Sequence, residues 1–341
     1  MVENPIKPVV ASLFSGAGGL DTGFENAGFH VSYANEFDKK ITPTLRANFP
    51  HSKIDDRSLF DVPSEDIPHA VGIVGGPPCQ SWSAGGAGRG FGDKRGQLFM
   101  EYIRVIRDKQ PLFFLAENVK GILSVRHKDA LKEIIDEFDA LGYNFTYKLV
   151  NAHDYGVPQD RWRVIFVGYH KSLGKTFEFP EEQKFKPTLR DAIGDLDGLA
   201  VAAPKNSTNG ALAPHANNEY MTGGFSPMFM SRNRVRGWED PSFTIQAGAR
   251  QAPLHPSAPK MVKTGENSHV FAPGHEDEYR RLSVREAARI QTFPDTYKFV
   301  YDNVAYGYKV IGNAVPVKLG QAIAEQIKKD IDPFLAKNST W

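Results

Sequence analysis

The single cysteine of the chain, Cys79, has neighbours that are typical of a reactive thiol. It follows the apolar run 70–74 in the sequence Gly75-Gly76-Pro77-Pro78-Cys79. The two prolines stiffen this loop, and α/β proteins keep their sites where such loops leave the carboxyl ends of parallel strands. A lone cysteine is more often a small buried apolar residue, but a loop of this composition is a poor place for one. We therefore interpret Cys79 as a candidate nucleophile that acts as a thiolate.

Charged residues stand at the ends of two other apolar runs. Glu117 closes the run 112–116. An unpaired carboxylate is costly in a core, which favours a site at the same sheet edge as the cysteine. Arg161 and Arg163 lead into the run 164–169, and in a strand their side chains would face one side. An ion pair at the edge of a sheet would explain the two arginines equally well.

A glycine-rich turn, Phe14-Ser15-Gly16-Ala17-Gly18-Gly19, ends the first apolar run and leads into a helical pattern. Glycines let the backbone approach a ligand closely, and the start of a helix adds partial positive charge. Two acidic residues, Glu36 and Asp56, end the next two runs, where a carboxylate in such folds can bind ribose hydroxyls. The structural alternatives are an ordinary turn and two solvated loop acids.

The elements that would position these residues alternate between strands and helices up to about residue 169, which is typical of a mostly parallel α/β sheet. We expect strands at 9–14, 30–34, 70–74, 112–116, 145–151 and 164–169, and helices at 20–27, 38–48, 97–109 and 127–141. From 171 to 276 proline, asparagine, serine and glycine become frequent, which predicts a second, irregular domain. Helical patterns return at 284–291 and 315–331, where Asp332-Pro333 should end the last helix. The sequence predicts one domain from 1–172 with 306–341, and another from 173–305.

Composition excludes several classes of protein. The 341 residues include 41 basic and 40 acidic side chains and one cysteine, so there is no intramolecular disulfide, cysteine-only zinc site or dithiol centre. We expect no signal peptide and no membrane span, because no apolar stretch has the required length. The sequence therefore predicts a cytosolic protein.

A net charge of +1 gives no overall attraction to a polyanion, so a nucleic acid would need a local basic patch. The segment 231–263 has six basic residues against two acidic ones. Arg232, Arg234 and Arg236 alternate in it and would point to one side of an extended segment. Arginine reads guanine through two hydrogen bonds, but these residues could also only position phosphates.

A second basic segment, 85–96, holds six of the 31 glycines together with Arg89, Lys94 and Arg95. We interpret it as a loop that closes over a phosphate backbone.

The motifs, taken in order, resemble those of the cytosine-C5 DNA methyltransferases, which use S-adenosylmethionine (SAM). The matching stretches are Phe14 to Gly19, Pro77 to Gln80, Glu117 to Val119, Gln159 to Arg163, Arg281 to Glu286 and Gly312 to Val317. They cover the chain from about residue 9 to residue 325. The resemblance implies a SAM-dependent methyltransferase fold, which is an α/β, Rossmann-like mixed sheet with a smaller, irregular DNA-recognition domain.

The resemblance also implies roles for single residues. Cys79 would add to C6 of cytosine, Glu117 would contact ring N3, Arg163 would hold the O2 edge and Arg161 would support the loop. The residues implied around SAM are Phe14, Gly16, Gly18 and Leu20 at the methionine end, Glu36 at the ribose, Asp56 at the adenine amine, and Pro78 and Asn313 completing the pocket. The target cytosine would be flipped out of the duplex.

The recognition segments, Phe229 to Arg236, Phe243 to Ala247 and Arg250 to Pro256, resemble those of HaeIII-type modification methyltransferases, which modify the inner cytosine of GGCC. Gly248-Ala249 and Lys94 depart from that pattern. We therefore expect the modification enzyme of a restriction-modification system, a monomer on double-stranded DNA without a metal, cytoplasmic and associated with the nucleoid of a prokaryote. The candidate DNA contacts are Arg89, Arg95, Arg232, Arg234, Arg236 and Arg250.

Three other functions remain open from the residues alone. An RNA methyltransferase that acts on tRNA would share the catalytic motifs. A catalytically silent DNA-binding relative would keep the fold. A thiol hydrolase would need a histidine beside Cys79, and no motif places one there.

Overall fold

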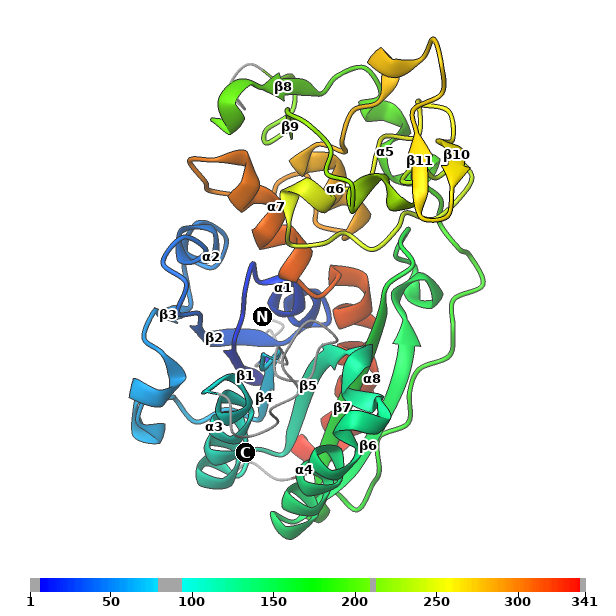
Figure 1. Cartoon of the computed structure of the whole chain (residues 1–341). Coiled ribbons are helices and arrows are strands. Elements are labelled where there is room, and N and C mark those ends of the chain that lie inside the picture. Colours follow the sequence, from blue (N-terminus) through cyan, green and yellow to red (C-terminus); the bar gives the residue numbers. More distant parts are fainter. Residues whose placement is uncertain (1–6, 79–93, 209–212, 338–341) are drawn as a thin grey trace.

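A computed structural model describes residues 7–78, 94–208 and 213–337, and at its centre lies one seven-stranded sheet (Figure 1). The strand order is β3-β2-β1-β4-β5-β7-β6. The strands are β1 (Val9–Leu13), β2 (His30–Asn35), β3 (Lys53–Asp55), β4 (Gly72–Gly75), β5 (Phe113–Val119), β6 (Tyr143–Asn151) and β7 (Trp162–His170). Strands β1 to β5 run parallel, whereas β7 is antiparallel to both β5 and β6. The predicted mixed α/β sheet is confirmed.

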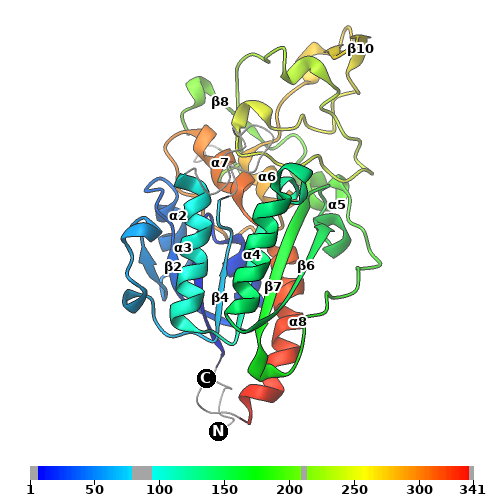
Figure 2. The ribbon, with the colours of Figure 1, turned by 60° about the horizontal axis from the view of Figure 1, so that its bottom comes forward.

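Helices cover both faces of this sheet, so the part of the molecule that contains the sheet has three layers (Figure 2). The helices are α1 (Gly19–Asn26), α2 (Thr42–Asn48), α3 (Lys94–Lys109), α4 (Lys128–Ala140) and α8 (Val317–Leu335). Side chains alternate across β5: Phe113 and Leu115 pack with α1 and α8, whereas Phe114 and Ala116 pack with α3 and α4. A strand with two buried faces reads as a continuous apolar run, which explains why β5 was visible in the sequence.

The C-terminal helix α8 returns to the start of the chain, as expected. Apolar residues at helical spacing, among them Ile323, Ile327 and Ile331, pack against the sheet beside α1. The two helices lie very close together. A Cβ on Gly23 in α1 would lie 2.6 Å from the amide nitrogen of Gln321 in α8, so only glycine fits at that crossing.

Several elements differ from the sequence-based expectation. The expected end of α8 at Asp332-Pro333 is wrong, because the helix continues through Pro333 to Leu335. A proline so near the end of a helix removes only one of its last hydrogen bonds. Helix α2 begins at Thr42, four residues later than expected, and α3 begins at Lys94, three residues earlier. Strand β3 and helix α7 (Val304–Asn313) were not expected at all; the Asn303 side chain caps α7 by accepting from the Ala305 amide at 2.9 Å.

The second lobe is built mainly from loops and short elements, as its composition indicated (Figure 1). Its elements are α5 (Leu189–Ile193), β8 (Val201–Ala203), β9 (Glu219–Met221), β10 (Val262–Gly265), β11 (Ser268–Val270) and α6 (Val284–Ile290). One buried cluster joins α6 and α7 to Leu45 and Phe49, which lie at the end of α2. The lobes therefore share a core. Among the described residues, no helix is both long enough and apolar enough to cross a membrane.

Candidate active site

The predicted pair of site residues, Glu117 and Arg163, meets at the carboxyl edge of the sheet. Arg163 Nε lies 2.6 Å from Glu117 Oε1, and both side chains are largely buried, 13% exposed for Arg163 and 12% for Glu117. The two residues stand diagonally across the antiparallel strands, since Glu117 is opposite Ile165 and Arg163 is opposite Val119. Arg163 thus holds the carboxylate of Glu117 in a fixed position. The ion pair does not use the other carboxylate oxygen, Oε2.

The loop that leads to the candidate nucleophile runs beside this carboxylate. A Cβ on Gly76 would lie 3.6 Å from Glu117 Oε2. Asn118 Nδ2 donates to the carbonyl of Pro77 at 3.3 Å, and the following residue, Pro78, is half-buried. Cys79 itself lies outside the described residues, but the segment just before it is fixed next to Glu117.

The glycine-rich turn forms one wall of a cavity that reaches Glu117. The cavity is lined by Ser12, Phe14, Ser15, Gly16, Leu20, Asp21, Gly75, Gly76, Glu117, Asn313, Ala314 and Val315. It thus brings together four of the predicted cofactor residues, from β1, α1 and the end of α7. Phe14 has a φ of 55°, a left-handed conformation that is rare for a residue with a side chain and that recurs at functional sites.

Glu36 lies near this wall but is already engaged with the backbone. Its Oε2 accepts from the Gly16 amide at 3.0 Å and its Oε1 from the Asp38 amide at 2.8 Å. Burial raises the pKa of this carboxyl group despite those two bonds. Glu36 therefore positions the glycine-rich turn, and each oxygen retains a second lone pair for a hydroxyl group.

Of the other predicted cofactor residues, Gly18, Asp56 and Pro78 are also not among the residues that line the cavity. Gly18 has a φ of 75°, and a Cβ there would lie 2.5 Å from the ring of Phe49, so that packing alone requires glycine. Asp56 is partly exposed and its Oδ2 accepts from Arg46 Nη2 at 3.1 Å. Its neighbour Asp55 is buried instead and bonds to Arg57.

Arg161 connects three segments of the chain. Its side chain is 1% exposed; Nη1 donates to the carbonyl of Ile245 at 3.0 Å, and Nη2 donates to those of Gly312 and Ala314 at 2.9 and 3.0 Å. Burial lowers the pKa of Arg161 well below its usual range. This geometry agrees with a supporting role, because both terminal nitrogens of the guanidinium donate to backbone carbonyls, while Nε is buried and has no partner among the described residues.

A buried pair of glutamines beside Arg161 was missed by the sequence reasoning. Gln159 Nε2 donates to Gln291 Oε1 at 2.9 Å, while its own Oε1 accepts from the Ile245 amide at 2.8 Å. Gln291 in turn donates to the carbonyl of Ile311 at 2.9 Å. The signal available was only that Gln159 belongs to the same motif as Arg161.

The alternating arginines do not share one exposed side, and Arg234 differs most from the expectation. It is 6% exposed, and its guanidinium donates to the carbonyls of Phe229 and Met228 at 2.8 and 3.1 Å. Both carbonyls belong to the short helical turn around residues 228–231, and these bonds hold the guanidinium in the interior. Arg236 Nη2 donates to Asp160 Oδ2 at 3.0 Å, and its guanidinium lies 4.3 Å from the centre of the Phe243 ring.

Arg232 and Arg250 remain exposed. A cavity of about 200 Å³ opens beside Arg232, between the lobes, and is also lined by Asp160, Asn233, Arg234, Phe243, Thr244, Gln246, Gln251 and Pro253. The other two candidate DNA contacts cannot be placed: Arg89 and the side chain of Arg95 lie outside the described residues.

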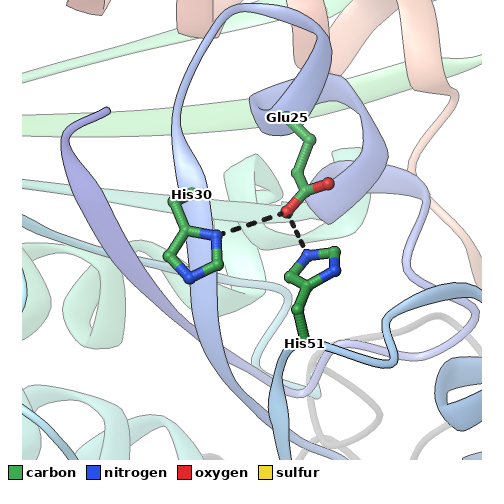
Figure 3. A group of neighbouring side chains, drawn as sticks. All are labelled: Glu25, His30 and His51. Atoms are coloured by element: carbon green, nitrogen blue, oxygen red, sulfur yellow. Dashed lines mark hydrogen bonds and ion pairs between the residues drawn. The ribbon is translucent and has the colours of Figure 1, made fainter. Parts of the chain in front are cut away.

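A cluster of possible metal ligands lies apart from this cavity (Figure 3). Glu25 Oε1 is 2.7 Å from His51 Nε2 and 4.0 Å from His30 Nδ1, and the three ligand atoms lie within 4.8 Å of one another. Zinc bonds of about 2.1 Å in a tetrahedron would bring ligand atoms to about 3.4 Å. A hydrogen bond between Glu25 and His51 accounts for the closest contact.

The sheet order, the antiparallel β7 and the cavity at the carboxyl edge define the fold of the SAM-dependent methyltransferases. The family model for C-5 cytosine-specific DNA methylases matches residues 9–329, and the chain belongs to this family. Its class of activity is DNA cytosine-5 methylation.

Curated relatives are similar over nearly their whole length. The type II methyltransferase M.NgoPII of Neisseria gonorrhoeae is 53% identical over 337 residues, which cover 96% of this chain and 97% of that protein. The type II methyltransferase M.MthTI of Methanothermobacter thermautotrophicus is 52% identical over 327 residues, covering 96% and 98%. Among solved structures, a putative DNA modification methyltransferase encoded within an E. coli prophage aligns with a TM-score of 0.72 at 24% identity, covering 96% of this chain and 100% of that one. At that identity the likeness supports the fold alone.

Proposed function

We propose that this chain methylates C5 of the inner cytosine of GGCC in double-stranded DNA and serves as the modification enzyme of a restriction-modification system. Residues 1–172 and 306–341 would carry catalysis, and residues 173–305 would recognise the DNA. The enzyme would act as a monomer in the cytoplasm, without a metal. The observation that carries the proposal is the Glu117 to Arg163 pair at the end of a cavity that also contains Asn313.

The cavity has the composition that SAM requires. SAM is the donor of an electrophilic methyl group, and its sulfonium and ammonium groups favour acidic surroundings. The described residues that line the cavity include two carboxylates, Asp21 and Glu117, and no lysine or arginine. Phe14, Gly16, Gly18 and Leu20 would surround the methionine end, with Gly18 acting by shaping the turn. Glu36 would bind the ribose and Asp56 the adenine amine, and Pro78 and Asn313 would complete the pocket.

Cytosine C5 is a weak nucleophile, so the ring must first be activated. The Cys79 thiolate would add to C6 while Glu117 supports protonation of N3, which turns the ring into an enamine that can take the methyl group at C5. Arg163, which pairs with Glu117, would hold the O2 edge of the base. Loss of the C5 proton and elimination of the Cys79 thiolate would then release the product.

Recognition of DNA would fall to the second lobe. Arg232 and Arg250 are exposed and free to reach bases or phosphates, with Arg89 and Arg95 contributing from the closing loop. Arg234 and Arg236 would act by shaping the recognition segment, since both guanidinium groups already have partners. The GGCC site itself rests on the resemblance of residues 229–236, 243–247 and 250–256 to HaeIII-type enzymes.

The test is incubation with labelled SAM and plasmid DNA, followed by mapping of 5-methylcytosine at single-base resolution. We expect methylation at the inner cytosine of GGCC, and a covalent complex on DNA in which 5-fluorocytosine replaces that base. Cys79→Ala should abolish both results but still bind SAM. Methylation mainly at other sites would overturn the GGCC assignment, and transfer to tRNA rather than to duplex DNA would overturn the substrate class.

A further inference from the structure

Asp21 is a buried acid that the proposed mechanism does not use. It lies in the first turn of α1 and is 0% exposed. Its Oδ1 accepts from Ser12 Oγ at 2.5 Å, and Ser15 Oγ donates to Ser12 Oγ at 2.9 Å. Its other oxygen, Oδ2, has no hydrogen-bond partner within the described part of the chain. Leaving a carboxylate oxygen without a partner in the interior costs free energy, so such a group calls for an explanation.

The cavity supplies that explanation, because Asp21, Ser12 and Ser15 all line it. The two carboxylates of the cavity differ in one respect. Glu117 already has a cation, the guanidinium of Arg163 at 2.6 Å, whereas Asp21 faces no basic side chain in the cavity lining. A cationic ligand group would therefore find its best partner at Asp21, on the wall that the glycine-rich turn forms.

We propose that Asp21 Oδ2 binds the α-ammonium group of the amino-acid end of SAM, and that Ser12 and Ser15 hold the carboxylate in the orientation required. The inference rests on the proposed function, because it takes SAM as the ligand of this cavity. The proposal gives Asp21, in the first turn of α1 just after the glycine-rich turn, a role in ligand binding.

The state of Asp21 in the protein without ligand agrees with this role. Burial raises the pKa of Asp21 to about 7, and the nearby charge of Glu25 acts in the same direction. The other titratable group that faces it is the Tyr297 hydroxyl, whose pKa burial raises well above its ordinary value. An ammonium group that binds only the ionised form should therefore bind more weakly as the pH falls below about 7, by up to tenfold per pH unit.

The experiment compares two ligands and two forms of the protein by calorimetric titration. The ligands are S-adenosylhomocysteine, which retains the ammonium group, and its analogue without the α-amino group. The variants are Asp21→Asn, which keeps the shape of the side chain, and the exposed Asp332→Asn as a matched control. We expect Asp21→Asn to weaken binding of S-adenosylhomocysteine about 10- to 100-fold, as for a lost charge-assisted hydrogen bond, and to leave binding of the analogue unchanged. Asp332→Asn should change neither.

The outcomes separate this inference from the proposed function. If Asp21→Asn weakens both ligands equally, or neither, Asp21 does not bind the ammonium group and the inference falls while SAM binding stands. If the wild-type protein binds neither ligand, the proposed function falls and takes the inference with it. A melting curve of Asp21→Asn guards against misfolding; we expect normal melting, since the change removes a buried group that can carry an uncompensated charge.

Discussion

Arg163 Nε and Glu117 Oε1 lie 2.6 Å apart, across two antiparallel strands at the carboxyl edge of the sheet. The pair is formed within the catalytic sheet alone, with no contribution from the second lobe. In the proposed mechanism Glu117 is therefore preorganised before DNA binds, which is the condition under which an electrostatic contribution to catalysis is largest.

The first prediction concerns this acid. Glu117→Gln preserves its shape but removes the charge and the ability to share a proton with ring N3. We expect methyl transfer to fall about 10²- to 10⁴-fold, the range for loss of a general acid or base. Labelled transfer to duplex DNA measures it, with the exposed Glu137→Gln as control. A rate within a few-fold of wild type would show that Glu117 does not act on the base.

Arg161 should matter for stability rather than for chemistry. Arg161→Met removes the side-chain donor of the buried Ile245 and Gly312 carbonyls and one of the two donors of the Ala314 carbonyl, so we expect the free energy of unfolding to fall by about 3 kcal/mol. The exposed Arg107, which pairs with Glu137, is the control, and Arg107→Met should cost less than about 1 kcal/mol. Urea unfolding curves of the two variants give the comparison, and equal costs would contradict the role of Arg161 as a connection between segments.

Gly312 should tolerate no side chain, because α7 contacts the second lobe there. A Cβ would lie 2.3 Å from the carbonyl carbon of Gln246 and 2.4 Å from the Ala247 amide nitrogen, both backbone atoms that cannot move aside easily. We expect Gly312→Ala to destabilise the protein by about 1–3 kcal/mol. Gly194→Ala is the control, since its nearest neighbour is a flexible Arg190 side chain at 3.4 Å. Similar melting temperatures for the two variants would count against this close approach.

His255 should make stability depend on pH. It is fully buried, 3.5 Å from Glu286, and burial lowers the pKa of its imidazole from 6.5 to about 4. Between these values the unfolded chain binds a proton that the folded protein does not, so the free energy of unfolding should decrease as the pH falls from 6.5 to 4, by up to about 3 kcal/mol.

Unfolding titrations at several pH values test this dependence. The variant His255→Gln should flatten the profile over that range, while the exposed His275→Gln should leave it as it is in the wild type. An unchanged slope in His255→Gln would assign the pH dependence to other groups.

Much of the fold was predictable because it depends on local patterns. The apolar runs of β1, β2, β4, β5 and β7 and the helical spacing in α8 are visible in the sequence, since buried strands and amphipathic helices have distinct periods. Strand β3, with three residues, is too short for a period to emerge. Helix α8 can continue through Pro333 because this proline lies near the end of the helix, and composition alone does not reveal where the helix ends.

The site was predictable in its residue types more than in its contacts. Glu117 was expected at the same sheet edge as Cys79, and Arg163 was expected near the base only from the resemblance; the structure brings Glu117 and Arg163 together. The partners of Arg161 and Arg234 were not predictable, because they are backbone carbonyls, and every residue has one. Asp21 was missed because an acid in the first turn of a helix is ordinary on its own. Only the fold reveals that it faces a cavity.

The packing of α8 against α1 also constrains how the protein is made. Asn313 and Val315 complete a cavity begun by Ser12 and Phe14, and α8 covers the helix that carries Asp21. During vectorial synthesis the first strand leaves the ribosome long before the last helix. A nascent chain therefore cannot complete this cavity until residues 313–335 have been made, and a product truncated before residue 313 should lack one of its walls.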